Sequence, residues 1–253
     1  MKRPIFLAGL AVVLSWGLSL RAAEPEPKKP ARPVYEEKKF FDPEGINKWY
    51  MGRQIAMVMG HQAAGWLERP EREKEENPAK LMEALKLRVD DVIADVGAGS
   101  GYFTFRMAQK APFGKVYAVD IQPEMLDIIK KRMKEKKIAN VVPVLGTESD
   151  PKLPENAVDL ILMVDVYHEL NFPYEMTEKM VQSLKPGGRM VFVEYRLEDP
   201  EVPIKLVHKM SEKQVIKEMT QFPLRHAETI GTLPWQHILI FRKPEAAPPP
   251  RAG

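Results

Sequence analysis

The chain has 253 residues, of which 44% are hydrophobic and 29% are charged, as is usual for a globular protein with a buried core. It contains no cysteine, which excludes disulfide bonds, thiol nucleophiles, iron–sulfur clusters and cysteine-bound zinc. The formal net charge of +3 comes from residues 1–23, which hold Lys2, Arg3 and Arg21 and no acid, so the composition of the remainder does not indicate a nucleic-acid partner.

The N-terminus has the layout of a secretory signal peptide. Lys2 and Arg3 precede an apolar stretch at 5–20, which is followed by two alanines and a polar run. The stretch is shorter than the ~20 residues that a membrane-spanning helix needs. We therefore expect residues 1–23 to be a signal peptide and the protein to be exported, either periplasmic or extracellular. An uncleaved N-terminal anchor is the alternative.

Proline-rich segments flank the part of the chain that can pack into a core. Residues 24–40 begin with prolines among charged residues, and the tail at 244–253 holds three consecutive prolines. Both compositions predict extended or disordered chain, a linker in the first case and a tail in the second. Residues 41–77 are rich in aromatic and apolar groups and predict an N-terminal helical extension. Residues 78–243 form the predicted main domain.

Strands and helices alternate through the main domain. A helix is expected to begin at Asn77–Pro78, because Asn is favoured as an N-cap and Pro in the first turn. Apolar runs and helical spacing then predict, in chain order, strand 92–96, helix 103–110, strand 115–120, helix 123–137, strand 141–145, strand 158–164, helix 174–184, a turn at 185–188, strand 189–194, helix 211–220, and an antiparallel pair at 224–230 and 236–242. This order predicts an α/β fold with a doubly wound, Rossmann-like, mostly parallel sheet and an antiparallel last strand.

A glycine-rich loop follows the first of these strands. Its sequence is Asp95-Val96-Gly97-Ala98-Gly99-Ser100-Gly101, between a strand and a helix, where doubly wound domains bind nucleotides. Tyr102, the next residue, is bulkier than the glycine or alanine of a dinucleotide fingerprint, and Asp95 would repel a pyrophosphate. A nicotinamide-dependent oxidoreductase therefore fits this loop less well and remains an alternative.

A second signal is the acid that ends the next strand. A carboxylate at Asp120 can accept hydrogen bonds from both hydroxyls of a ribose, although it could also cap the helix that follows. Together with the glycine loop and the Lys185-Pro186-Gly187-Gly188 turn, this acid makes a stronger pattern than the loop alone.

These motifs resemble those of the class I S-adenosylmethionine-dependent methyltransferases. The matching pieces are residues 95–101, 117–120, 159–162 and 185–188, and the resemblance covers roughly 80–243. It implies methyl transfer with S-adenosyl-L-methionine as cofactor. The cofactor-binding residues that it implies are Asp95, Gly97, Ala98, Gly99, Gly101, Asp120, Ile121, Glu148 and Asp165. The family often has an acid at the position of Thr147, so Glu148 is the first choice for the adenine contact and Asp150 the second.

Candidate catalytic residues follow the fourth and fifth strands, where the acceptor should lie. Similar motifs in the small-molecule branch of the family place a histidine after the fourth strand, where this chain has His168. It is a candidate general base, oriented by Asp165 or Glu169, or else a structural residue that caps the next helix. Glu194, which is followed by Tyr195-Arg196, either lines the acceptor pocket or belongs to a structural ion-pair cluster.

The remaining motifs are weaker. Gly60-His61-Gln62 with Trp66-Leu67 predicts either a lid over the pocket or packing at the domain edge. His208 and His237 are expected to be structural, and no metal site is expected, because scattered histidines lack ligand spacing.

The sequence thus predicts a methyltransferase that acts on a small molecule, does not act on nucleic acid, and has no membrane segment beyond the signal. An exported, non-catalytic binding domain is a second alternative, since the methyl donor is made in the cytosol.

Overall fold

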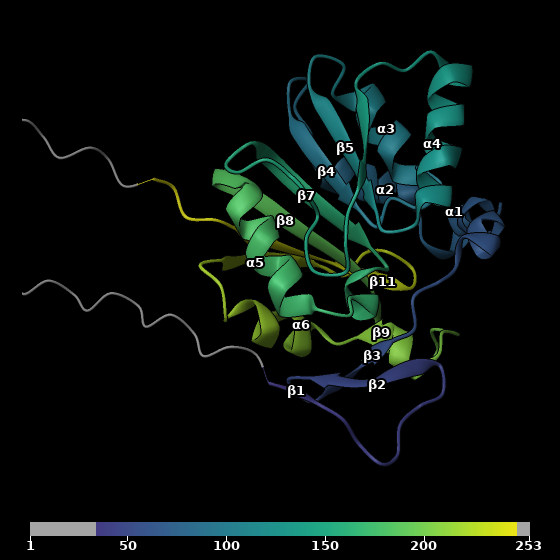
Figure 1. Cartoon of the computed structure of the whole chain (residues 1–253), viewed down its shortest axis with the longest axis vertical. Helices are drawn as coiled ribbons and strands as arrows, with labels where there is room; N and C mark the ends of the chain where they lie inside the picture. Colours follow the sequence, from purple (N-terminus) through teal and green to yellow (C-terminus); the bar gives the residue numbers. More distant parts are fainter. Residues whose placement is uncertain (1–33, 247–253) are drawn as a thin grey trace, which may run out of the picture. The chain divides into compact units, whose positions relative to one another are not determined.

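The computed structural model describes residues 34–246 (Figure 1). The predicted signal peptide, most of the predicted linker and the end of the predicted tail lie outside these residues. In chain order the elements are β1 (Tyr35–Glu36), β2 (Gly45–Tyr50), β3 (Arg53–Ala56), η1 (His61–Glu68), α1 (Arg72–Glu75), α2 (Pro78–Ala84), β4 (Val92–Val96), α3 (Tyr102–Lys110), β5 (Lys115–Asp120), α4 (Pro123–Lys136), β6 (Val141–Leu145), β7 (Val158–Val164), η2 (Tyr167–Glu169), α5 (Pro173–Ser183), β8 (Leu184–Arg196), η3 (Leu206–His208), β9 (Lys209–Met210), α6 (Glu212–Met219), β10 (Arg225–Ile230) and β11 (Gln236–Arg242). No helix within residues 34–246 is both long enough and apolar enough to span a bilayer.

The main sheet confirms the predicted fold class. Its strand order is β10-β11-β8-β7-β4-β5-β6, with β9 paired to β8. The strands β6, β5, β4, β7 and β8 are parallel, whereas β11 runs antiparallel to β8 and β10 antiparallel to β11. The chain winds outward from β4 to β6 and then returns to place β7 on the other side of β4. Ligands of doubly wound sheets bind at this reversal, beyond the carboxyl ends of the strands.

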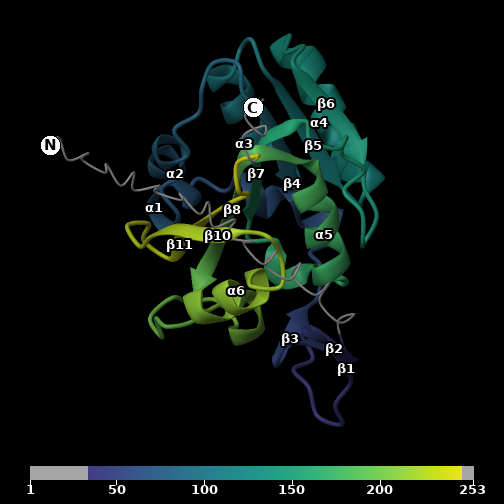
Figure 2. The same cartoon turned by 90° about the vertical axis from the view of Figure 1, so that its left-hand side faces the viewer.

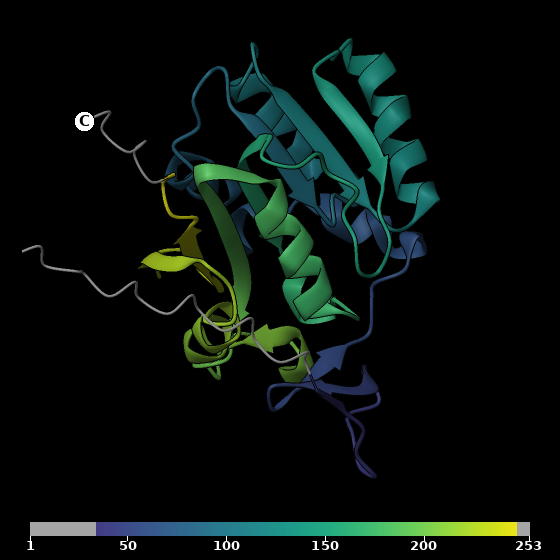
Figure 3. The same ribbon diagram turned by 60° about the vertical axis from the view of Figure 1, so that its left-hand side comes forward.

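Helices cover both faces of this sheet, with α2, α3 and α4 on one side and α5 and α6 on the other (Figures 1 and 3). Strand β7 shows the alternation that this requires. Leu160 and Leu162 pack into the first hydrophobic cluster, and Ile161 and Met163 pack into the second. All four side chains are fully buried, as expected for a continuous apolar run in a parallel strand.

Two local predictions have different outcomes. The Asn77 side chain accepts the backbone N–H of Lys80 at the start of α2, which confirms the predicted cap. The predicted turn at 185–188 is wrong, because β8 continues through it as an irregular stretch. Backbone hydrogen bonds join residues 187–188 to Lys243, just after β11. Gly187 has a φ of 76°, which allows the strand to bend at this point.

The predicted helical extension at 41–77 is wrong in its first part. Strands β1, β2 and β3 form a separate three-stranded antiparallel sheet, which lies near α6 in Figure 2. Met51 and Gly52 connect β2 to β3, and both have positive φ, as tight hairpin turns require. Tyr35 of β1 falls in the predicted linker, yet its ring centroid lies 5.6 Å from that of Tyr50. Helical structure begins only at η1.

Candidate functional site

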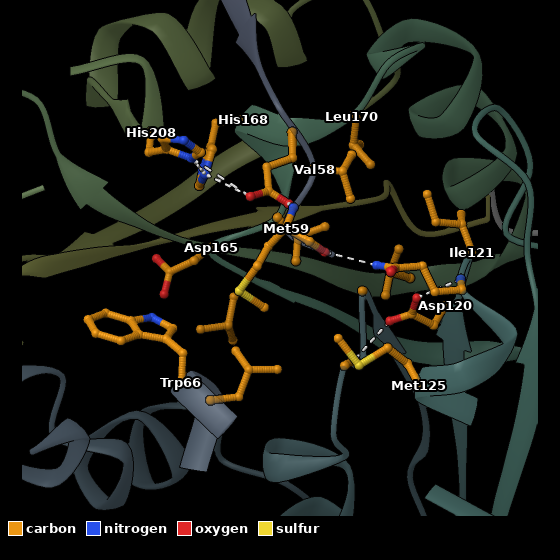
Figure 4. Close-up of a pocket in the computed structure, with 18 of the residues that line it drawn as sticks. Val58, Met59, Trp66, Asp120, Ile121, Met125, Asp165, His168, Leu170 and His208 are labelled. Carbon is orange, nitrogen blue, oxygen red and sulfur yellow. Dashed lines mark hydrogen bonds and ion pairs between the residues drawn. The ribbon is translucent and has the colours of Figure 1, made fainter. Parts of the chain in front are cut away.

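A cavity of about 450 Å³ lies at the carboxyl ends of the central strands (Figure 4). The glycine loop, Asp120 and residues that follow β7, including Asp165 and His168, line it. Its volume is typical of a small-molecule site, and its position coincides with the reversal of strand order.

The glycine loop exposes its backbone to the cavity at two positions. Gly97 and Gly99 have φ values of 74° and 53°, which side chains rarely adopt. A Cβ atom on Gly97 would lie 2.4 Å from Val166, and one on Gly99 would lie 2.5 Å from Leu67. A side chain at Gly97 would clash with Val166, and one at Gly99 would have to displace the end of the Leu67 side chain.

Asp120 holds this loop in place and faces the cavity. Its Oδ2 accepts the backbone N–H of Gly99 at 2.9 Å, and its Oδ1 accepts that of Gln122 at 2.9 Å. Each carboxylate oxygen can accept a further hydrogen bond, so two neighbouring donor hydroxyls could bind here. Burial raises the pKa of Asp120, and the backbone hydrogen bonds oppose that shift.

Asp165 lines the cavity and has one buried oxygen without a hydrogen-bond partner among the described residues. The residue has a φ of 55°, and its Oδ2 accepts a hydrogen bond from the Gln236 side chain at 2.7 Å. Its Oδ1 is buried and has no partner among residues 34–246. Burial, followed by the nearby Glu76 and Glu194, raises the pKa of Asp165 well above its ordinary value. A ligand that donates a hydrogen bond or carries a positive charge would satisfy this oxygen.

Three of the predicted cofactor residues support the loop and do not line the cavity. Asp95 accepts the Thr104 hydroxyl at 2.5 Å, beneath the loop. The carbonyl of Ala98 accepts the N–H of Gly101, and a Cβ on Gly101 would lie 2.7 Å from Phe105. Asp95, Ala98 and Gly101 are absent from the cavity wall, and their direct contacts with a ligand stay predictions. Ile121 and Glu148 do line the cavity, together with Thr147.

The buried Asp95 carboxyl gives a testable dependence of stability on pH. Burial raises its pKa to about 6 from 3.8, so the folded state binds the proton more tightly than the unfolded chain. Its contribution to stability is therefore complete below pH 3.8 and is lost as the pH rises through 6, a change of about 3 kcal/mol.

In Asp95→Asn the amide oxygen still accepts the Thr104 hydroxyl but does not titrate. We therefore expect the stability of this variant not to fall through the same pH range. Urea unfolding of both proteins at pH 4, 5, 6 and 7 should show the variant gaining relative stability as the pH rises. A constant difference across the series would contradict the assignment.

A segment N-terminal to the main domain closes the cavity on one side. This covering segment (residues 57–69) places Trp66 and Leu67 in the cavity wall, which agrees with the predicted lid. The Gln122 side chain connects the segment to the end of β5: it accepts the N–H of His61 at 2.8 Å and donates to the carbonyl of Met59 at 2.9 Å. Gln122 was not identified from the sequence, because a glutamine between a strand and a helix has no distinguishing pattern.

Two histidines and a glutamate meet at the other end of the cavity (Figure 4). In this acceptor-side cluster (His168, Glu169 and His208), Nε2 of His168 lies 3.2 Å from Nδ1 of His208. Oε1 of Glu169 lies 3.9 Å from the first nitrogen and 3.7 Å from the second. Burial lowers the pKa of each histidine to about 4, so both imidazoles are neutral near pH 7.

Glu194 orients His168. Its Oε2 lies 2.5 Å from Nδ1 of His168, and its Oε1 accepts the N–H of Tyr167 at 2.9 Å. This corrects two expectations: neither Asp165 nor Glu169 orients the ring, and Glu194 lies fully buried behind His168, outside the cavity wall. Burial raises the pKa of Glu194 to about 8. When Nδ1 donates to this carboxylate, Nε2 retains the lone pair.

His208, which the sequence predicts to be structural, lines the cavity beside His168. The two histidines are separated by a helix and a long strand, so no local spacing could have linked them. His237 is buried and does not line the cavity. At the end of β8 each alternative holds for one residue: Tyr195 lines the cavity, whereas Arg196 pairs with Asp199 at 3.0 Å.

A buried ion pair supports the backbone of the cluster. Arg53 of β3 donates from Nε to Oε1 of Glu218 at 2.7 Å and from Nη1 to the carbonyl of His168 at 3.2 Å. Glu218 also accepts hydrogen bonds from the Tyr167 hydroxyl at 2.7 Å and from Gln214 at 2.8 Å. The small N-terminal sheet and α6 are thereby joined directly behind η2.

Comparison with known proteins identifies the central part of the chain. Residues 93–188 match a family model described as a methyltransferase domain. An uncharacterized methyltransferase of Mycobacterium bovis is 33% identical over 101 residues, which are 40% of this chain and 38% of that protein. A demethylmenaquinone methyltransferase of a Geobacillus species is 31% identical over 103 residues, 40% of this chain and 43% of that protein. The chain therefore spans about two fifths of the length of these curated relatives.

The fold itself extends further than this match. The crystal structure of a SAM-dependent methyltransferase from Aquifex aeolicus aligns with a TM-score of 0.69 and 22% identity, covering 74% of this chain and 100% of that one. None of these similarities supports the nicotinamide-dependent or the non-catalytic alternative.

Proposed function

Because its central domain belongs to the class I S-adenosylmethionine-dependent methyltransferases, we propose that this protein transfers the methyl group of S-adenosylmethionine to a small-molecule acceptor. One observation carries the proposal. A single cavity has the glycine loop, Asp120 and the unsatisfied Asp165 oxygen at one end, and two neutral imidazoles with a carboxylate at the other.

The residues at the first end suit the methyl donor. When bound, S-adenosylmethionine supplies a methyl group on a positively charged sulfur. The glycine loop admits a ligand close to its backbone, and Asp120 has acceptor capacity for the two ribose hydroxyls. Asp165 offers its unsatisfied oxygen to the ammonium group, and Ile121 with Glu148 would lie by the adenine. The buried acids Asp165 and Asp120 also favour a ligand with a net positive charge.

The end of the cavity that holds the two histidines is enclosed, which favours a small acceptor. The His168 side chain is only 2% exposed, so an acceptor must enter the cavity to reach it. Apolar side chains line this region, among them Val58, Leu170, Met176 and Ile204. A compact, partly apolar molecule fits such a wall better than a nucleic acid does, because a nucleic acid requires an exposed basic surface.

His168 is our candidate catalytic residue, with Glu194 as the residue that positions it. An acceptor that carries a proton on its nucleophilic atom must lose that proton as the methyl group is transferred. When Nδ1 donates to Glu194, Nε2 of His168 keeps its lone pair, and the acceptor would replace Nδ1 of His208, 3.2 Å away, as its hydrogen-bond partner. The cavity walls exclude water and hold the acceptor, which promotes the in-line displacement.

Calorimetric titration of the whole chain with S-adenosylmethionine, S-adenosylhomocysteine and NADH tests the donor assignment. We expect micromolar binding of both sulfur compounds and none of NADH. Failure to bind either sulfur compound would overturn the proposed function.

Removal of the proposed base should abolish most turnover. With an acceptor identified by screening, we expect His168→Ala to lower kcat by about 10²–10⁴-fold, the usual contribution of a general base, with little change in S-adenosylhomocysteine affinity. His226→Ala is the matched control, because His226 is exposed on β10. Equal kcat values for the native protein and His168→Ala would rule out this role.

Export is a separate proposal. It rests on the signal-like composition of residues 1–23, which lie outside the described part of the chain. Fractionation of cells that produce the chain with a C-terminal tag should recover it outside the cytosol, with a mass reduced by the signal. An intact mass in the membrane fraction would indicate the uncleaved anchor instead.

A further inference from the structure

We propose that the acceptor-side cluster (His168, Glu169 and His208) binds one divalent first-row transition-metal ion, such as Zn²⁺, and that this ion holds the methyl acceptor. The role of the ion rests on the proposed function, whereas its binding rests on the geometry of the three side chains alone.

The spacing of the three ligand atoms fits an ion. With metal–ligand bonds of about 2.1 Å and angles between 90° and 109°, neighbouring ligand atoms lie about 3.0–3.4 Å apart. The separations here are 3.2 Å between the two imidazole nitrogens and 3.7 and 3.9 Å from these to Oε1 of Glu169. Small rotations of the Glu169 side chain would bring its oxygen into range. Two imidazoles and a carboxylate are a donor set that transition metals prefer over magnesium or calcium.

The surroundings resemble those of a metal site in a second respect. A histidine that binds a metal through one nitrogen usually donates from the other to a carboxylate, which fixes its orientation. Oε2 of Glu194 lies 2.5 Å from Nδ1 of His168, so the other ring nitrogen, Nε2, points toward His208. The second oxygen of Glu169 accepts the N–H of Met59 at 3.3 Å, which holds that carboxylate as well.

A cation would also balance the local charge. Glu169 and Glu194 are both largely buried, and within residues 34–246 the titratable nitrogens within 4.0 Å of their oxygens belong to the neutral imidazoles of His168 and His208. The guanidinium of Arg53 opposes the rise in the pKa of Glu194 but makes no ion pair with either carboxylate. Buried carboxylates without a strong cationic partner are costly. An ion bound by two neutral imidazoles and a carboxylate would supply this positive charge.

The position of the cluster in the cavity wall gives the ion a function. Three protein ligands leave one or more coordination positions open, as in catalytic zinc sites. An acceptor with a hydroxyl or thiol group would bind there and lose its proton to water more readily, because the ion lowers the pKa of a bound group. Nε2 of His168 then holds the ion and no longer takes the proton itself.

The test uses the whole, tag-free chain with Co²⁺, Zn²⁺ and Mg²⁺. We expect one equivalent of Co²⁺ to bind with visible d–d absorption, Zn²⁺ to displace it, and Mg²⁺ to leave the spectrum unchanged. His208→Ala and the isosteric Glu169→Gln should each weaken Co²⁺ binding by at least tenfold. The control variant His226→Ala should bind Co²⁺ as tightly as the native chain. If His208→Ala fails to fold, as judged by its melting curve, Glu169→Gln decides the question.

Absence of stoichiometric Co²⁺ binding to the folded native chain, or equal binding by Glu169→Gln, would overturn the metal site. Titration of the same metal-free samples with S-adenosylhomocysteine separates this result from the proposed function. Binding of that compound without Co²⁺ binding would remove the ion and leave the methyltransferase assignment intact.

Discussion

Replacing Asp120 with alanine is expected to weaken S-adenosylhomocysteine binding by about 100-fold or more. The carboxylate has one unused acceptor position on each oxygen, and each hydrogen bond to a charged group is worth about 1.5–3 kcal/mol. Loss of two such bonds corresponds to a factor of about 100 or greater. The substitution also removes the acceptor of the Gly99 N–H, so the glycine loop loses its anchor. Calorimetric titration measures the change directly.

Asp127→Ala is the matched control for this experiment. Asp127 is an aspartate on α4 whose side chain is 71% exposed and pairs only with Lys130. Its removal should leave binding unchanged. Similar affinities for Asp120→Ala and the native protein would mean that the donor does not use this carboxylate.

Replacing Glu218 with alanine is expected to lower the free energy of unfolding by about 3–5 kcal/mol, because it leaves a buried guanidinium without its partner. The Glu218 side chain is fully buried, and that of Arg53 is 10% exposed. The substitution would also leave the Tyr167 hydroxyl and the Gln214 amide without their acceptor. Urea unfolding at neutral pH, followed by tryptophan fluorescence, measures the effect.

The exposed pair between Lys131 and Glu135 provides the comparison. These charges lie 4.0 Å apart on the surface of α4, and Glu135→Ala should change stability by no more than about 0.5 kcal/mol. Equal effects for Glu218→Ala and Glu135→Ala would show that the Arg53 pair contributes nothing beyond an ordinary surface contact.

The donor half of the site was predictable because its signals are local. In the stretch from β4 to α3, the strand, the glycine positions and the helix follow one another, and each glycine is required by a positive φ or a close approach. Asp120 at the end of β5 has a similarly fixed position relative to the loop. The burial of Asp95 beneath the loop was not predictable, because the sequence shows that an acid is present but not which way it faces.

The acceptor half was not predictable in the same way. His168 and His208 belong to different elements, and only the pairing of β9 with β8 and the path of η3 bring them together. The prediction of helix over β2 and β3 rests on their content of aromatic and apolar residues, which does not distinguish a helix from a strand. The Met51–Gly52 turn, which separates the two strands, has no strong sequence signature because methionine is rare at positive φ.

The covering segment and η3 both lie outside residues 93–188, the part of the chain that matches the methyltransferase family model. Trp66 and Leu67 precede that part, and Ile204 and His208 follow it, yet all four form the cavity wall. The cavity therefore draws on two parts of the chain: the interior supplies the glycine loop, Asp120, His168 and Glu169, and the two flanking segments complete the wall around them. We expect changes in these flanks to reshape the cavity while the strand ends of the interior stay in place, so chains that share the interior can differ in the molecules that they bind.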